Sequence, residues 1–107
     1  MYEVDFRNAV LTEVNLVEVF VEGARLNGAR LHRADLRGTD LSRADMRDAD
    51  LTGADLSGAN LSTADFRGAN FTGAVLVGTQ LEGANLTNAI WLDGLPCMSP
   101  LIGRCVR

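Results

Sequence analysis

The strongest constraint in the sequence is a five-residue repeat that runs through most of the chain. Every fifth position from residue 6 to residue 91 holds a large apolar residue, and 12 of these 18 positions are Leu. Two positions earlier lies a smaller residue, which is Ala in 13 repeats, Val in three and Thr in two. Asp or Asn mostly precedes the large residue, and Gly follows two positions after it in half of the repeats. The fold must therefore bury two apolar side chains out of every five.

Neither regular secondary structure suits a period of five. A helix would rotate the large residues by about 500° per repeat and scatter them around its axis. A strand would send successive large residues to opposite faces. The chain must therefore turn once per repeat, and Gly, Asp and Asn at fixed offsets are residues that tolerate tight turns. These features predict a solenoid whose coils stack about 4.8 Å apart through backbone hydrogen bonds.

One stretch of the chain resembles a known family. The run ADLRGTDLSRADMRDADLTGADLSGANLSTADFRGANFTGAVL is similar to the pentapeptide-repeat proteins, whose unit is A-(D/N)-L-x-x, and the resemblance covers residues 4 to 92. It implies an all-β fold, a single right-handed quadrilateral β-helix with one repeat per side and four repeats per coil. Eighteen repeats would then form four to five coils, with residues 20 apart lying above one another.

We expect one domain with two parts, because halves of a 107-residue chain would each be short of core. Residues 1–93 are assigned to the β-helix and residues 94–107 to a C-terminal capping tail. Residues 1–22 follow the repeat less well, with Val replacing Ala three times and with Val17 and Phe20 at outward positions. Terminal repeats of solenoids are commonly atypical. We therefore expect an irregular first coil that is either a cap or an apolar contact surface.

The tail is similar to a W-x-D-G-x-x-C segment followed by G-x-C that follows the repeats in many family members. Trp91 is expected to plug the last coil. Cys97 and Cys105 are the only cysteines, and we favour a disulfide between them over two independent thiols. Such a bond persists in an oxidising space and would favour a periplasm or thylakoid lumen over the cytoplasm. The start of the chain lacks a basic segment followed by an apolar core, so it predicts no signal peptide.

Charge is banded along the chain. Ten Arg and no Lys oppose 14 acidic residues, which gives a net charge of −4, and six Arg fall between residues 23 and 47. We expect a protein partner of unknown identity to contact this band or the first coil, and a homodimer to form through the N-terminal coil. The candidate residues are Phe20, Val17, Arg30, Arg33, Arg37 and Arg43. The acidic balance and the few aromatic residues argue against nucleic-acid binding.

The composition argues against an enzyme. His32 is the only His and lies at an outward position, and without Lys there is no Schiff-base or Walker-type chemistry. We expect no cofactor, no metal, no small-molecule substrate and no membrane span. The sequence favours a non-catalytic structural or protein-interaction module. The alternative is a DNA-mimicking inhibitor of DNA gyrase, which the ten Arg oppose because duplex DNA carries one negative charge per ~1.7 Å.

Overall fold

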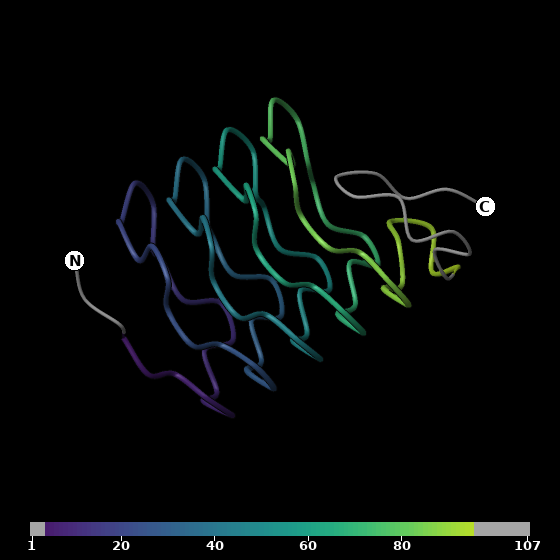
Figure 1. Cartoon of the computed structure of the whole chain (residues 1–107), viewed down its shortest axis with the longest axis horizontal. Helices are drawn as coiled ribbons and strands as arrows, with labels where there is room; N and C mark the ends of the chain where they lie inside the picture. The colour runs from purple at the N-terminus through teal and green to yellow at the C-terminus, as the bar shows by residue number, and fades with distance from the viewer. Residues whose placement is uncertain (1–3, 96–107) are drawn as a thin grey trace.

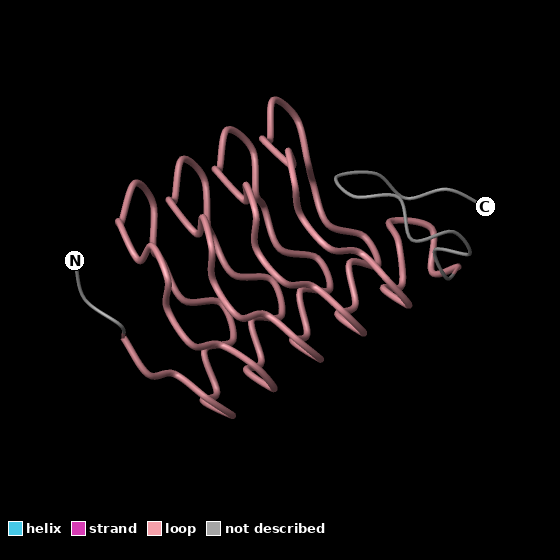
Figure 2. Cartoon of the chain, in the orientation of Figure 1, coloured by secondary structure: helices cyan, strands magenta, loops and turns pink. Residues whose placement is uncertain are grey.

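The chain winds repeatedly around one axis, with its two ends at opposite ends of the stack (Figure 1). The structure is a computed structural model that describes residues 4–95. Within this range the backbone forms isolated parallel β-bridges joined by turns, without a helix or a continuous strand (Figure 2). The described residues contain no helix long and apolar enough to cross a membrane.

The bridges set the register of the stack. Each one joins residues 20 apart, from Asp5↔Arg25 at one end to Asn70↔Ile90 at the other. With five residues per repeat, four repeats complete one coil, which confirms the predicted stacking of residues 20 apart. In a typical repeat, Asp45 N–H donates to Ala24 O at 2.9 Å and Met46 N–H donates to Asp65 O at 2.7 Å. The coils are therefore held together by main-chain hydrogen bonds on all four sides.

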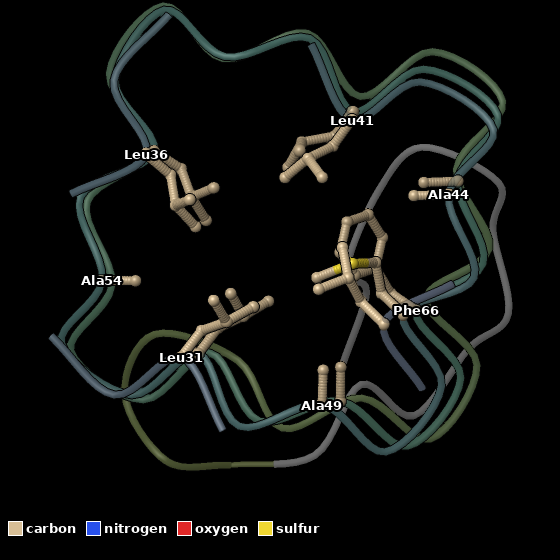
Figure 3. Packing of buried hydrophobic residues seen from close by; sticks show 14 of the residues in the cluster. Leu31, Leu36, Leu41, Ala44, Ala49, Ala54 and Phe66 are labelled. Atoms are coloured by element: carbon tan, nitrogen blue, oxygen red, sulfur yellow. The ribbon is translucent and has the colours of Figure 1, made fainter. Parts of the chain in front are cut away.

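The core is the interior of the coil. Met46, Leu56 and Phe66 are fully buried, and every inward Ala from Ala24 to Ala89 is at most 7% exposed. The inward side chains form stacked rows of large and small residues, seen down the axis in Figure 3 for Leu31, Leu36, Leu41, Ala44, Ala49, Ala54 and Phe66. Small residues alternate with large ones because the narrow interior has no room for two large side chains side by side.

Each corner of the coil requires the left-handed backbone conformation. The residue two positions after each inward large residue has a positive φ from Asn8 to Asn88, and nine of these residues are Gly. At Gly58, with φ of 71°, an added Cβ would meet no atom within 4 Å. The preference for Gly there is therefore conformational rather than steric. Thr63 adopts the same conformation, with φ of 56°, despite its β-branched side chain.

The expectation of an irregular first coil is wrong for the backbone. Residues 4–23, which we call the first coil, make the same bridges, corner turns and inter-coil hydrogen bonds as later coils. They differ in burial, since the inward side chains of this coil are only partly buried up to Val19. The substituted residues still place one large and one smaller apolar side chain inward per repeat, and that pattern is what the coil requires.

Candidate interaction surface

The Asp or Asn before each inward large residue completes the hydrogen bonding of the backbone. Its side-chain oxygen accepts the N–H of the residue two positions later, as from Ser62 to Asn60 at 3.0 Å. In the repeat Asn60–Ala64 this N–H is the one amide without a main-chain acceptor, since the other four donate to carbonyls of a neighbouring coil or of their own turn. When the later residue is Ser or Thr, its hydroxyl donates to the same oxygen, at 2.6 Å for Ser62. Much of the polar outer surface is thus used by the fold itself.

When the later residue is Arg, the pair becomes a two-pronged ion pair within one repeat. Arg47 donates from Nε at 2.8 Å and from Nη2 at 2.7 Å to the two carboxylate oxygens of Asp45. The same Asp–x–Arg fork occurs at Asp5–Arg7, Asp35–Arg37 and Asp65–Arg67. Hydrogen bonding to Arg7 lowers the pKa of Asp5 from 3.8 to about 2. Hydrogen bonding to Arg47 likewise lowers the pKa of Asp45.

These forks were not anticipated from the sequence, although the recurrence of Asp–x–Arg four times was the signal that could have revealed them. Stacking of the coils offers a second way for opposite charges to approach one another. The bridges do bring Arg25 beside Asp45 and Arg30 beside Asp50. The short ion pairs, however, join residues two apart, because both side chains of a fork leave the same outer face.

The predicted arginine surface is therefore largely compensated by carboxylates. Arg37 is forked on Asp35 at 2.7 Å. Two other candidates pair between coils over longer distances, Arg43 with Glu22 at 3.6 Å and Arg33 with Glu13 at 3.9 Å. Arg30 lies beside Asp50 and helps to lower the pKa of that carboxyl group.

A hydrogen-bonded chain of three side chains runs beside Arg30. His32 Nδ1 lies 2.7 Å from Thr52 Oγ1, and Thr52 Oγ1 donates to Asp50 at 2.6 Å. Partial burial works to raise the pKa of Asp50, but the Thr52 hydrogen bonds and the nearby His32 and Arg30 lower it overall. His32 is exposed on the outer face, as the sequence suggested. The chain of bonds lies on the outside of the coil, where water has access.

A few exposed apolar residues stand out from this polar surface. Phe20 is 81% exposed and Val10 is 70% exposed, both in the first coil, while Val17 is half-buried. Near the other end, Val77 is 72% exposed and Val75 is 42% exposed. Phe20, Val10 and Val75 occupy positions where most repeats have the Asp or Asn that binds the backbone. These three side chains therefore do not accept a backbone N–H as Asp or Asn does at this position.

At the C-terminal end, Trp91 is half-buried and its ring lies 5.1 Å from that of Phe71, which in turn lies 5.1 Å from Phe66. Trp91 N–H donates to Leu95 O, which closes a turn longer than those of the preceding repeats. Cys97 and Cys105 lie outside the described residues.

Hollows on the described surface are open and shallow. One of about 350 Å³ is lined by Arg47, Asp48, Arg67, Gly68 and Asn88, along one corner of the coil. The described residues hold no group of three or more His, Cys, Asp or Glu placed to bind a metal ion.

Comparison with known proteins gives one family and several related folds. The family model described as Pentapeptide repeats matches in eight copies over residues 1–28, 29–68 and 64–90. HetL of the cyanobacterium Nostoc sp. strain PCC 7120, a pentapeptide repeat protein involved in heterocyst differentiation regulation, is 39% identical with a TM-score of 0.53. That match covers 81% of this chain but 42% of HetL, so the chain spans less than half of its length. No curated protein matches the chain significantly.

A second similar structure is a pentapeptide repeat protein of the Arabidopsis thaliana thylakoid lumen. It is 28% identical over 94% of this chain and 81% of its own length, with a TM-score of 0.56.

Proposed function

The chain belongs to the pentapeptide-repeat family, and from that premise we propose that it is a non-catalytic module that binds another protein through the outside of its coil. The scaffold of this proposal is a right-handed quadrilateral β-helix of four to five coils, closed at its C-terminal end by residues 94–107. The 20-residue spacing of the bridges supports this scaffold. A rigid stack holds outer side chains on a fixed grid, which suits recognition of a partner surface.

Phe20 carries the proposal. Elsewhere the residue at this position is mostly an Asp or Asn that accepts a backbone N–H, as Asn60 does from Ser62. Phe20 gives up that hydrogen bond and leaves an aromatic side chain 81% exposed. Large exposed aromatic residues are enriched among the residues that dominate binding energy in protein interfaces. Phe20 costs the fold a hydrogen bond and exposes an aromatic ring to water. A role of this ring in binding a partner accounts for both.

The test compares partner capture by the wild type with capture by Phe20→Asn, which restores the backbone acceptor. Proteins retained from an extract of the source organism would be identified, purified and titrated against the chain by calorimetry. We expect a retained protein to bind the wild type at least about tenfold more tightly than the variant. Equal binding by the wild type and Phe20→Asn would show that Phe20 is not part of the binding surface. The proposal would be contradicted if no purified protein binds, neither a different protein nor a second copy of this chain.

Mimicry of duplex DNA has less support. A DNA mimic needs a dense array of uncompensated negative charge. Here four Asp are forked by Arg, and Glu13 and Glu22 pair with Arg33 and Arg43. Inhibition of gyrase supercoiling by the purified chain would reverse this ranking.

For the tail, the proposal retains a disulfide between Cys97 and Cys105, and with it an oxidising compartment. The similarity to a protein of the thylakoid lumen is consistent with such a compartment. Intact mass after alkylation under denaturing, non-reducing conditions tests the bond. Addition of two alkyl groups to freshly isolated protein would exclude the bond and the localisation that rests on it.

A further inference from the structure

Within residues 4–95, the first coil has an edge of unpaired main-chain groups on the side that faces away from the second coil. We call this the N-terminal edge and define it by Asp5, Val10, Asn15 and Phe20, one on each successive face. In the second coil the equivalent residues donate to the coil below, as Arg25 N–H does to Val4 O at 2.7 Å. Within residues 4–95, the N–H and C=O of the four edge residues have no main-chain partner. Each edge residue therefore presents one donor and one acceptor, and among the described residues the C=O groups of Arg7, Thr12, Val17 and Glu22 are further acceptors without a main-chain partner.

The interior behind this edge is unusually apolar. Three of its four smaller inward positions are Val, namely Val4, Val14 and Val19, where every later coil has Ala or Thr. These side chains are partly buried, as are Phe6, Leu11 and Leu16. Larger apolar groups at an open end gain most when another surface covers them, because burial stabilises in proportion to the area removed from water.

Three acidic side chains of the first coil are paired with Arg within the molecule. Asp5 is forked by Arg7 at 2.7 Å. Glu13 and Glu22 face Arg33 and Arg43 of the second coil, at 3.9 and 3.6 Å. Charge repulsion between two such edges is thereby reduced.

We propose that the occupant of the N-terminal edge is a second copy of this chain, bound edge to edge about a twofold axis perpendicular to the axis of the coil. The inference rests on the proposed binding function and names its partner. A twofold axis makes the facing backbones antiparallel, so each edge residue can exchange its N–H and its C=O with one residue of the other copy. The donors and acceptors of one edge then match the acceptors and donors of the identical edge. An unrelated partner would match them only if it had the same spacing of groups.

The size of the molecule sets an upper limit on such an interface. Its two shorter extents are 25 and 24 Å, so each edge can offer at most roughly 600 Å², and two copies can bury at most about 1,200 Å², which is where the range of stable specific interfaces begins. The interface would combine an apolar centre with main-chain hydrogen bonds around its rim.

The rise of the coil selects one register. Each coil climbs by one strand spacing, about 4.8 Å, over its four faces. The N-terminal edge therefore rises along the coil axis from its first face to its last. Two such edges related by a twofold axis stay in contact on all four faces only when the first face of one copy lies opposite the last face of the other. Any other register leaves a gap one strand wide on at least one face. The dimer therefore places Asp5 opposite Phe20 and Val10 opposite Asn15, and the Phe20 ring lies against the Asp5–Arg7 fork.

The first experiment measures molecular mass by sedimentation equilibrium over a wide range of concentrations. Wild-type chain is expected to dimerise, and Val10→Asn combined with Phe20→Asn to raise the dissociation constant by about tenfold or more. Both substitutions restore the usual backbone acceptor, so the monomer keeps its fold, as a thermal unfolding curve would verify. Val75→Asn is the matched control, since it makes the same change at the same repeat position near the other end.

A wild type that stays monomeric at every concentration, or a dimer weakened by Val75→Asn but not by the edge variant, would overturn the inference. Continued binding of the wild type to a different purified protein would then leave the proposed function intact. If the wild type neither dimerises nor binds a different purified protein, both proposals are wrong.

The second experiment tests the register by cross-linking. Val10→Cys and Asn15→Cys are made in separate chains whose Cys97 and Cys105 are replaced by Ala. Opposed residues in an antiparallel pair lie about 5.5 Å apart between Cα atoms, which a disulfide can span. Oxidation of the mixture should link one variant to the other, while each variant alone should stay unlinked. A covalent dimer of either variant alone, or none in the mixture, would refute this register.

Discussion

The first coil, residues 4–23, and the middle coil, residues 44–63, have the same backbone conformation. They differ in how deeply their inward side chains are buried and in which side chains occupy the outer positions. Both form bridges 20 residues apart and the same bonds between coils. In the middle coil the inward side chains are all at most 1% exposed, and all four outer positions before the large residue hold Asp or Asn. In the first coil the inward side chains are partly buried up to Val19, and Val10 and Phe20 replace two of those acceptors.

The comparison separates what forms the coil from what adapts it. A large and a smaller apolar residue facing inward, with a left-handed corner residue, suffice to wind the backbone. The Asp or Asn acceptors, the Gly corners and full burial are added stabilisation that varies from coil to coil. A terminal coil can therefore exchange stability for a binding surface without losing its path.

The largest expected difference between the two coils is in their cores. Leu56→Ala, in the middle coil, should lower the free energy of unfolding by about 2–5 kcal/mol, because it leaves a cavity at a fully buried site. Leu11→Ala in the first coil should cost less than half as much, since Leu11 is only partly buried. Denaturant unfolding of both variants measures the difference.

Asp55→Ala is the control for the middle coil, because Asp55 is adjacent to Leu56 but lies on the outer face. Its loss should be well below that of Leu56→Ala. Equal losses from Asp55→Ala and Leu56→Ala would contradict the division into inward and outward positions.

The next largest effect concerns the backbone acceptors. Asn60→Ala should destabilise by about 1–1.5 kcal/mol, because it removes the acceptor for both the N–H and the hydroxyl of Ser62. Val10→Asn should act in the opposite direction by up to about 1 kcal/mol, since Thr12 could then bind Asn as Thr72 binds Asn70. Thermal unfolding at low protein concentration, where association does not contribute, checks both signs. Stabilisation by Asn60→Ala would mean that the acceptor role is misassigned.

The period of five alone predicted a solenoid, because it excludes helices and strands and requires a turn in every repeat. Four repeats per coil came from the resemblance to the family, and the bridges between residues 20 apart agree with it. Sequence reasoning also placed Phe20 outward and Leu56 inward, since these follow from position in the repeat. It did not predict the forks, because the charges were counted in bands along the chain and not within the repeat, where Asp45 and Arg47 share a face. It overestimated the irregularity of the first coil, since Val in place of Ala changes the volume inside the coil and leaves the backbone path intact.

A smaller effect is expected at the corners. Gly58→Ala should cost about 0.5–1 kcal/mol, because a Cβ there is strained by the positive φ although it meets no atom within 4 Å. Thr63→Gly should raise the free energy of unfolding by up to about 0.5 kcal/mol. The reason is that removing the strain of a β-branched residue in the left-handed region outweighs the entropy cost of Gly. Chemical denaturation gives both values. A stabilising Gly58→Ala would show that the corner conformation is not limiting.

The smallest effects belong to the exposed forks, and they are best seen as a pH dependence. The pKa of Asp5 is about 2 in the folded chain against an ordinary value of 3.8, because Arg7 donates hydrogen bonds to the ionised carboxylate. A lowered folded-state pKa stabilises the fold above the unfolded-state value, and this contribution is lost as pH falls from about 3.8 towards 2. The melting temperature should therefore decline over that interval.

The two coils should respond differently when their forks are removed. Arg7→Gln leaves Asp5 with Arg25 as its other nearby cation, whereas Arg47→Gln leaves Asp45 beside Arg67, which is itself forked on Asp65. Titration of the carboxyl carbons by NMR should show the pKa of Asp5 rising in Arg7→Gln and that of Asp45 rising in Arg47→Gln, each with no change at the other site. Each variant should also lose less stability than the wild type on acidification. Unchanged carboxyl pKa values in both variants would show that the forks do not hold these carboxylates ionised, and the acid sensitivity would then have to arise elsewhere in the chain.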